Sequence, residues 1–131
     1  MTGKVAIAKA VFAAWGKQDH AAVLAFLHDD IEYQNMPFPD VIRGKAGMAE
    51  FMAKFGKSMS DIKVELHNII EAGDLVFHEG VETYKRKGVP VALPYAGVFA
   101  FKDGLIIGWR DYFDVMTMEK QLAAGKDAAK A

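Results

Sequence analysis

Cysteine is absent from this sequence, and so are long apolar runs and long runs of one charge. A protein without cysteine has no disulfide, no thiolate zinc site and no thiol nucleophile, and it suits a reducing compartment. No segment approaches the length of a transmembrane helix, and the first residues lack the apolar core of a secretory signal peptide. We therefore expect a cytoplasmic protein with no membrane partner.

An excess of charge is also lacking, because 16 Lys and Arg against 17 Asp and Glu give a formal net charge of −1. The longest basic run, 85–87, is too short for the patches that bind nucleic acids, so we expect no nucleic-acid partner. The 131 residues, 52% of them hydrophobic, suffice for one core and not for two. We expect a single domain over 1–131 that binds a small, hydrophobic and largely uncharged molecule.

The first half of the chain has the hydrophobic spacing of helices. Apolar residues three or four positions apart predict helices over 4–15 and 45–57, and Asp19 stands where a short helix over 20–27 would have its N-cap. Between these helices, 31–35 is predicted to be a short strand, because the two prolines that follow do not fit the interior of a sheet. The chain therefore begins with helices that flank a single strand.

Strands dominate the second half of the chain. Alternating apolar and polar residues predict four of them, which begin near 62 and then cover 75–86, 91–101 and 105–114. A short helix over 116–123 and a frayed tail over 124–131 are expected to follow. This order predicts an α+β fold in which a cone-shaped, curved, mixed or antiparallel sheet wraps around the N-terminal helices, with a pocket between them.

The turn at 102–104 decides which residue lies opposite Asp111 in the last hairpin. A two-residue Asp-Gly turn places Ala96 there, whereas a three-residue loop, with Gly104 in the left-handed conformation, places Tyr95 there. We expect the three-residue loop.

The segment 108–114, GWRDYFD, places a carboxylate between large apolar groups. Trp109, Asp111 and Phe113 share one face of a strand, so burial of the two rings takes the carboxylate with them. A buried carboxylate needs hydrogen-bond donors or a shared proton. Asp111 is therefore a candidate general base, the alternative being a structural carboxylate bonded to the backbone.

The first strand directs two further polar side chains inward. Tyr33 and Asn35 share a face with Ile31, so both are candidates to hold a water beside Asp111. In the alternative interpretation, Tyr33 covers the edge of the core and Asn35 bonds the backbone of the turn.

His78, Glu82 and Tyr84 lie on one face of the strand predicted over 75–86. If this face borders the pocket, Glu82 is a candidate acid whose pKa an apolar wall would raise, and His78 is expected to titrate beside it. The alternative places both residues on the solvent face of the sheet.

Aromatic and methionine side chains are expected to form the wall that contacts a hydrophobic ligand. We assign this role to Phe12, Trp15, Met52, Phe55, Tyr84, Tyr95, Trp109 and Phe113. The four histidines lack metal-ligand spacing, and the sequence has neither a glycine-rich phosphate loop nor a GxSxG motif. We therefore expect no metal and no cofactor.

Two segments, IEYQNMP at 31–37 and GVFAFKDGLIIGWRDYFD at 97–114, make the chain resemble the limonene-1,2-epoxide hydrolase family. That family lies within the nuclear transport factor 2-like superfamily, together with ketosteroid isomerases, scytalone dehydratase and SnoaL-like polyketide cyclases. The resemblance implies a cystatin-like α+β barrel, and it implies a homodimer formed through the sheet, because such dimers are common in the superfamily.

In the limonene-1,2-epoxide hydrolase family, a tyrosine, an asparagine and an aspartate activate a water, and a second aspartate donates a proton to the epoxide oxygen. The resemblance implies that Tyr33, Asn35 and Asp111 hold this water. It also implies that Glu82, longer by one methylene, replaces the proton-donating aspartate.

The chain departs from the family at Gly80, which stands where an arginine bridges the two carboxylates. We hypothesise that a protonated His78 takes the place of this arginine between Glu82 and Asp111. Three functions remain, and we expect the first of them. They are one-step hydrolysis of a small epoxide, an isomerase, dehydratase or cyclase reaction through a histidine–carboxylate pair, and binding of a hydrophobic ligand without catalysis.

Overall fold

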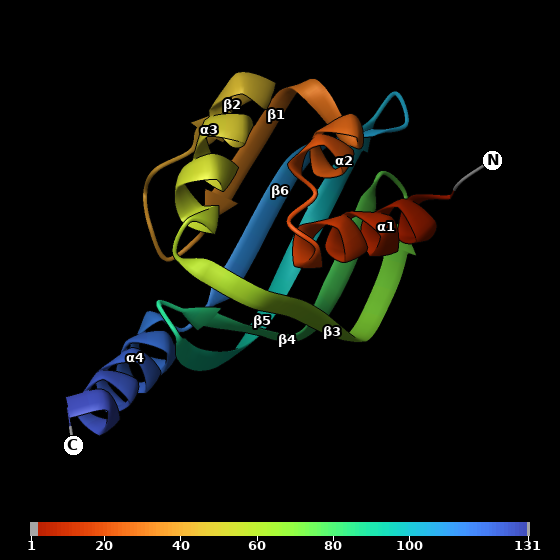
Figure 1. Cartoon of the computed structure of the whole chain (residues 1–131). Helices are drawn as coiled ribbons and strands as arrows, with labels where there is room; N and C mark the ends of the chain where they lie inside the picture. Colours follow the sequence, from red (N-terminus) through yellow and green to blue (C-terminus); the bar gives the residue numbers. More distant parts are fainter. Residues whose placement is uncertain (1–2, 131) are drawn as a thin grey trace.

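A six-stranded sheet curves around the N-terminal helices in the computed structural model (Figure 1). The structure describes residues 3–130, and for 127–130 it describes the backbone alone. The helices are α1 (Lys4–Gly16), α2 (His20–Ala25), α3 (Gly44–Gly56) and α4 (Val115–Lys130). The strands are β1 (Leu27–Asn35), β2 (Ile42–Arg43), β3 (Met59–Ala72), β4 (Leu75–Arg86), β5 (Val89–Lys102) and β6 (Leu105–Phe113). Their spatial order is β2-β1-β6-β5-β4-β3.

The sheet is mixed. Strands β3, β4, β5 and β6 form an antiparallel succession, whereas β1 runs parallel to β6. The short β2 pairs antiparallel with β1 and forms that edge of the sheet. Figure 1 shows α1, α2 and α3 on one side of the curved sheet, while α4 projects away from the body of the protein. The expected α+β architecture, a curved sheet wrapped around N-terminal helices, is thereby confirmed.

The core lies between the concave face of the sheet and helices α1 and α3. Helix α1 buries the stripe that its spacing predicts, and Val11 is fully buried within it. Met48 of α3 and Phe99 of β5 are also inaccessible to solvent. Full burial of one such side chain stabilises the fold by about 1.5–3 kcal/mol, so these contacts fix α1 and α3 over the sheet.

Several element boundaries differ from those expected. Asp19 caps α2 as predicted, its side chain accepting a hydrogen bond from the backbone of Ala22, but β1 begins at Leu27 and takes the end of the expected helix. Helix α4 is also longer than expected, because it continues to Lys130. The backbone of 124–130 is therefore helical, where a frayed tail was expected. Ala131 lies outside the described residues.

The hairpin between β5 and β6 has a register that neither predicted turn produces. The turn is the two-residue one, with Asp103 and Gly104 both at positive φ, so the expected three-residue loop is wrong. The pairing then shifts by one residue at Ile107, which has no partner on β5. As a result Gly97, and neither Tyr95 nor Ala96, lies opposite Asp111.

The shift at Ile107 has a physical reason. Ile106 and Trp109 are both buried on the concave face, although they are three positions apart and a regular strand would place them on opposite faces. A bulge adds one residue to β6 and reverses the alternation between them, so both apolar side chains enter the core.

No helix among residues 3–130 is long and apolar enough to cross a membrane.

Candidate active site

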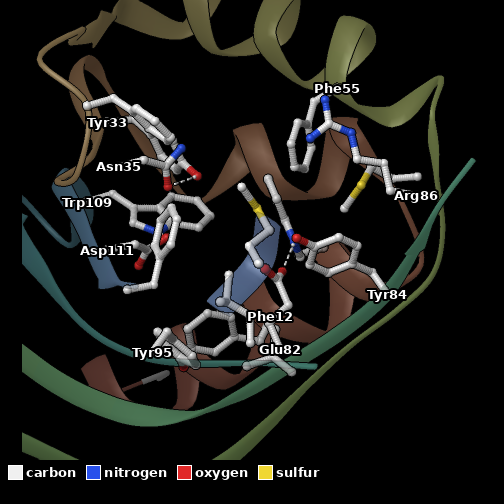
Figure 2. Close-up of a pocket in the computed structure, with 17 residues that line it drawn as sticks. Phe12, Tyr33, Asn35, Phe55, Glu82, Tyr84, Arg86, Tyr95, Trp109 and Asp111 are labelled. Atoms are coloured by element: carbon white, nitrogen blue, oxygen red, sulfur yellow. Dashed lines mark hydrogen bonds between the residues drawn. The ribbon is translucent and has the colours of Figure 1, made fainter. Parts of the chain in front are cut away.

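A cavity of about 170 Å³ lies between the concave face of the sheet and the helices that cover it (Figure 2). Its wall is largely apolar and aromatic, and the charged residues in it are Glu82, Asp111 and Arg86. Figure 2 shows Asp111 and Arg86 at opposite sides of the cavity, with Glu82 at its floor. The chain thus brings two acids from different strands into one apolar space.

Asp111 enters the cavity from β6, and its neighbour on the same face supplies a donor to it. Trp109 Nε1 donates a hydrogen bond to Asp111 Oδ2 at 3.1 Å, while Oδ1 is buried and has no hydrogen-bond partner. Burial, together with the charge of Glu82, raises the pKa of the Asp111 carboxyl to about 8, against the opposing effect of the Trp109 hydrogen bond.

Glu82 enters from β4 and receives its donor from a helix. Trp15 Nε1 of α1 donates to Glu82 Oε2 at 2.8 Å, across 67 positions of sequence. Burial raises the pKa of Glu82 to about 7, against the opposing effect of this hydrogen bond. The two tryptophans of the chain therefore hold one carboxylate each.

The two carboxylates form one titrating pair. Their pKa values are both raised by burial, and the charge of Glu82 acts on Asp111, so at neutral pH the pair retains at least one proton. The indole rings that hold them also contact each other, Trp15 packing edge-on to Trp109 at 5.5 Å between ring centroids. A carboxylate and a carboxylic acid in one apolar cavity are the components of acid–base catalysis.

Strand β1 places Tyr33 and Asn35 beside this pair. The parallel pairing of β1 with β6 sets Asn35 opposite Asp111 and Tyr33 opposite Trp109. The Tyr33 hydroxyl donates to Asn35 Oδ1 at 3.3 Å, and no hydrogen bond joins either residue directly to Asp111. Burial raises the pKa of Tyr33 well above its usual value, so its hydroxyl keeps its proton.

His78 lies behind the cavity wall. It is 3% exposed, its Nδ1 is 3.2 Å from the Tyr95 hydroxyl, and its ring packs against Phe12 and Phe99. Burial lowers the pKa of His78 to about 4, so the ring is neutral at neutral pH. The hypothesis of a protonated His78 between Glu82 and Asp111 is therefore wrong, because a buried apolar site disfavours the charged imidazole.

Comparison with known proteins identifies the family. A model described as a SnoaL-like domain matches residues 8–109. The chain belongs to the SnoaL-like domain family. Epoxide hydrolase EphG of Mycobacterium tuberculosis is 33% identical over 117 residues, which cover 89% of this SnoaL-like chain and 77% of that protein.

Solved structures support the same assignment. The structure of a limonene epoxide hydrolase-like (LEH-like) epoxide hydrolase from M. tuberculosis matches this SnoaL-like domain with a TM-score of 0.82 and 32% identity, over 94% of this chain and 91% of that one. A protein of Catenulispora acidiphila with a ketosteroid isomerase-like fold matches with a TM-score of 0.82 and 23% identity, over 92% and 93% of the two chains, and shows the fold alone. The expected cone-shaped fold and the resemblance to epoxide hydrolases are thereby confirmed.

Position 80, where the resemblance to the limonene-1,2-epoxide hydrolase family implies an arginine, is a glycine for a structural reason. A Cβ on Gly80 would lie 1.9 Å from the backbone oxygen of Glu65, so the backbone of β3 occupies the place of a side chain. The register of β3 against β4 shifts nearby, between Leu66 and Asn68. This SnoaL-like domain therefore has no room at position 80 for the bridging arginine.

Most of the expected wall residues line the cavity. They are Phe12, Trp15, Phe55, Tyr84, Tyr95, Trp109 and Phe113. Met52 is instead buried in the core and does not line this cavity. The face of β4 that carries His78 and Tyr84 is the inner one, because these two residues are buried whereas Phe77 and Glu79 are exposed.

Six lining residues were not assigned from the sequence to the wall. They are Phe38, Met59, Val64, Arg86, Leu93 and Met118. The alternation of apolar and polar residues on β3 and β5 could have predicted that Val64 and Leu93 face inward. No such pattern predicts Phe38, because it lies in the loop after β1. Among residues 3–130, no three His, Asp or Glu side chains gather in the arrangement of a metal site.

Replacing Gly80 by arginine is expected to destabilise the protein rather than add a bridging cation. The new side chain would displace the backbone of β3, so we expect the free energy of unfolding to fall by at least about 2 kcal/mol. Urea denaturation measures this change. Gly3→Ala, whose Cβ meets no atom within 4 Å, is the control. A Gly80→Arg variant as stable as the wild type would contradict this account of β3.

Proposed function

We propose that this protein hydrolyses a small hydrophobic epoxide, adding one water in a single step without a cofactor. The observation that carries the proposal is the pair of carboxylates, Asp111 and Glu82, that enters one apolar cavity with the pKa of both groups raised. The similarity to epoxide hydrolase EphG and to the solved structure of an LEH-like epoxide hydrolase, both of M. tuberculosis, supports the same reaction. The aromatic wall favours an apolar substrate.

In the proposed reaction Asp111 acts as the general base from the state of the pair in which Asp111 is ionised and Glu82 is protonated. Because the pKa of Asp111 is about 8 and that of Glu82 about 7, this state is the minor one at neutral pH, and the reaction proceeds from it. A water between Asp111 and the polar groups of Tyr33 and Asn35 loses a proton to the carboxylate while its oxygen attacks one epoxide carbon. Tyr33 and Asn35 suit the role of positioning this water, because β1 sets them next to Asp111 and they carry donors and acceptors.

Glu82 acts as the general acid in the same step. As the bond between the epoxide carbon and oxygen breaks, the protonated Glu82 gives its proton to that oxygen, and a vicinal diol results. Asp111 then carries the proton taken from water, and the pair returns to its starting state when one proton moves from Asp111 to Glu82 through solvent or product. The reaction consumes one water and leaves the protein unchanged.

Neutral donors make this division of roles possible without a cation. Each carboxylate accepts one indole hydrogen bond, which favours its ionised form, while burial favours the protonated form. The pair therefore keeps one exchangeable proton near neutral pH, which the reaction needs. The isomerase and cyclase alternative relied on a titrating His78 in the cavity, and the neutral ring behind the wall gives it less support.

Removing either carboxyl is expected to abolish most epoxide hydrolysis. We expect Asp111→Asn and Glu82→Gln each to lower kcat/KM by about 10²- to 10⁴-fold, the usual contribution of a general acid or base. A panel of cyclic and terpenoid epoxides in ¹⁸O-labelled water, with detection of the diol by mass spectrometry, measures turnover. Glu79→Gln, on the exposed face of β4, is the matched control and should retain wild-type activity.

The pH profile of the same reaction provides a second readout. Activity should fall at acid pH as the base gains a proton and at alkaline pH as the acid loses one, with the maximum near the raised pKa values, about 7 and 8. Full activity of Asp111→Asn would contradict the hydrolase proposal. Proton exchange on an enolisable ketone without diol formation would instead favour an isomerase.

We also propose that two copies of the chain associate through the outer, convex face of the sheet. Ile70, Phe77 and Tyr112 are exposed there by 64%, 47% and 48%. Ile70 of β3 pairs with Phe77 of β4, so the two side chains lie on the same face of the sheet. Tyr112 of β6 pairs with Ala96 of β5, and Ala96 pairs with Glu79 of β4, which lies on the same face as Phe77. Tyr112 therefore lies on this face too. Large exposed apolar side chains on one sheet face favour burial against a second copy.

Charge on this face is expected to separate the two copies. The double variant Phe77→Asp and Tyr112→Asp should sediment as a monomer in analytical ultracentrifugation, while the wild type sediments as a dimer. Met116→Asp is the control, because Met116 is 61% exposed and lies on α4 rather than on a strand of the sheet. A wild type that stays monomeric at all protein concentrations would refute the dimer.

A further inference from the structure

Three residues on neighbouring strands form one row across the concave face of the sheet. His78 of β4 lies opposite Gly97 of β5, and Gly97 in turn lies opposite Asp111 of β6. His78 and Asp111 are thus two strands apart, with the glycine between them. Only the one-residue shift at Ile107 brings Gly97, rather than a residue with a side chain, into this position.

The glycine allows the two flanking side chains to converge. A Cβ on Gly97 would lie 2.6 Å from His78 Cε1 and 2.7 Å from Asp111 Oδ1, so both groups lean over the space that a side chain would fill. Any larger residue at 97 would push them apart. The two groups are therefore close enough for one water to bridge them.

The same two side chains carry unsatisfied polar atoms. Among the side chains that the structure describes, the buried nitrogen and oxygen atoms without a hydrogen-bond partner are His78 Nε2 and Asp111 Oδ1. Buried polar groups almost always have a hydrogen-bond partner. The two unpaired atoms, which lie on either side of one glycine, are therefore candidates to be each other's partner.

The tautomer of His78 follows from its other nitrogen. Nδ1 lies 3.2 Å from the hydroxyl of Tyr95, which can donate its proton to that nitrogen. The ring proton is then on Nε2, which becomes the donor toward the Asp111 carboxylate. The other tautomer would direct a lone pair of Nε2 at an ionised oxygen, which is unfavourable.

We propose that neutral His78 is a positioning residue for Asp111, its Nε2–H donating to Oδ1 above Gly97, directly or through one water, while the Tyr95 hydroxyl fixes the tautomer. The carboxylate then has a donor on each oxygen, Trp109 on Oδ2 and His78 on Oδ1. Its remaining lone pairs stay available to a water in the cavity. A neutral group thus supplies to Asp111 a donor of the kind that the resemblance would assign to an arginine.

The arrangement has a measurable effect on the titration of Asp111. A donor to the ionised form lowers the pKa of a carboxyl, and its removal raises the pKa. Among the other titratable groups, Glu82 from β4 raises the pKa of Asp111. The charge of Asp111 in turn adds to burial in raising the pKa of Tyr95 from β5 and of Tyr33 from β1. The phenols keep their protons, so Glu82 is the group that must be held constant in the test.

The test compares His78→Leu, which removes the donor, with His78→Gln, which restores a side-chain N–H, both in a Glu82→Gln background. We expect His78→Leu to raise the pKa of Asp111 by about one to two units, and His78→Gln to raise it by less than half as much. Carboxyl ¹³C NMR of labelled aspartate follows this titration directly. It needs no substrate, so failure of the positioning role and failure of the hydrolase proposal are distinguishable.

Nitrogen-15 NMR of the wild type supplies an independent readout, and we expect His78 to carry its proton on Nε2 throughout neutral pH. Val76→Ala, a cavity-forming change two residues away on the same strand, is the control for lost stability and should leave the Asp111 titration unchanged. An unchanged Asp111 pKa in His78→Leu, or a proton found on Nδ1 in the wild type, would overturn the proposal.

Discussion

The burial of two carboxylates in one apolar cavity is the constraint on which the rest of this structure depends. Removing an ionised carboxylate from water costs several kcal/mol unless a cation, hydrogen-bond donors or a proton compensates. Among the side chains that the structure describes, no Lys or Arg forms an ion pair with Asp111 or Glu82. Position 80 is closed by the backbone of β3, and Arg86 lies across the cavity from Asp111. The burial of the two carboxylates is therefore compensated by neutral hydrogen-bond donors and a shared proton.

The tryptophans show how the fold supplies those donors. Trp15 comes from α1 and Trp109 from β6, and each indole serves one carboxylate while its ring packs against the other ring. An indole nitrogen is only a donor, so it cannot accept the proton of a carboxylic acid. The packing of α1 on the sheet and the state of the acid pair are therefore coupled, because moving the helix would remove the donor to Glu82.

Much of this site was predictable from alternation alone. The period-two pattern of the strands placed Tyr33 and Asn35 on one inward face and Trp109 and Asp111 on another, because a strand exposes every second side chain to the core. The order of elements gave the α+β architecture for the same reason. The resemblance to epoxide hydrolases then assigned roles that the pattern itself does not contain.

What the sequence did not reveal depends on contacts between distant segments. The bulge at Ile107 changed the residue opposite Asp111, and it arises because Ile106 and Trp109 both need the core. The hydrogen bond from Trp15 to Glu82 joins a helix to a strand, so no local pattern signals it. His78 appeared to be a cation on the sequence, yet its burial among aromatic rings keeps it neutral.

The dependence of stability on pH tests the central claim most directly. A carboxyl whose pKa is raised in the folded protein binds more protons folded than unfolded, so its folded state loses stability as pH rises through the folded value. Compared with an Asp111→Asn, Glu82→Gln double variant, the wild type should lose unfolding free energy between about pH 4 and pH 8, by an amount on the order of several kcal/mol. Parallel stability curves for the two proteins across that range would show that the carboxylates are solvated, and would contradict the account.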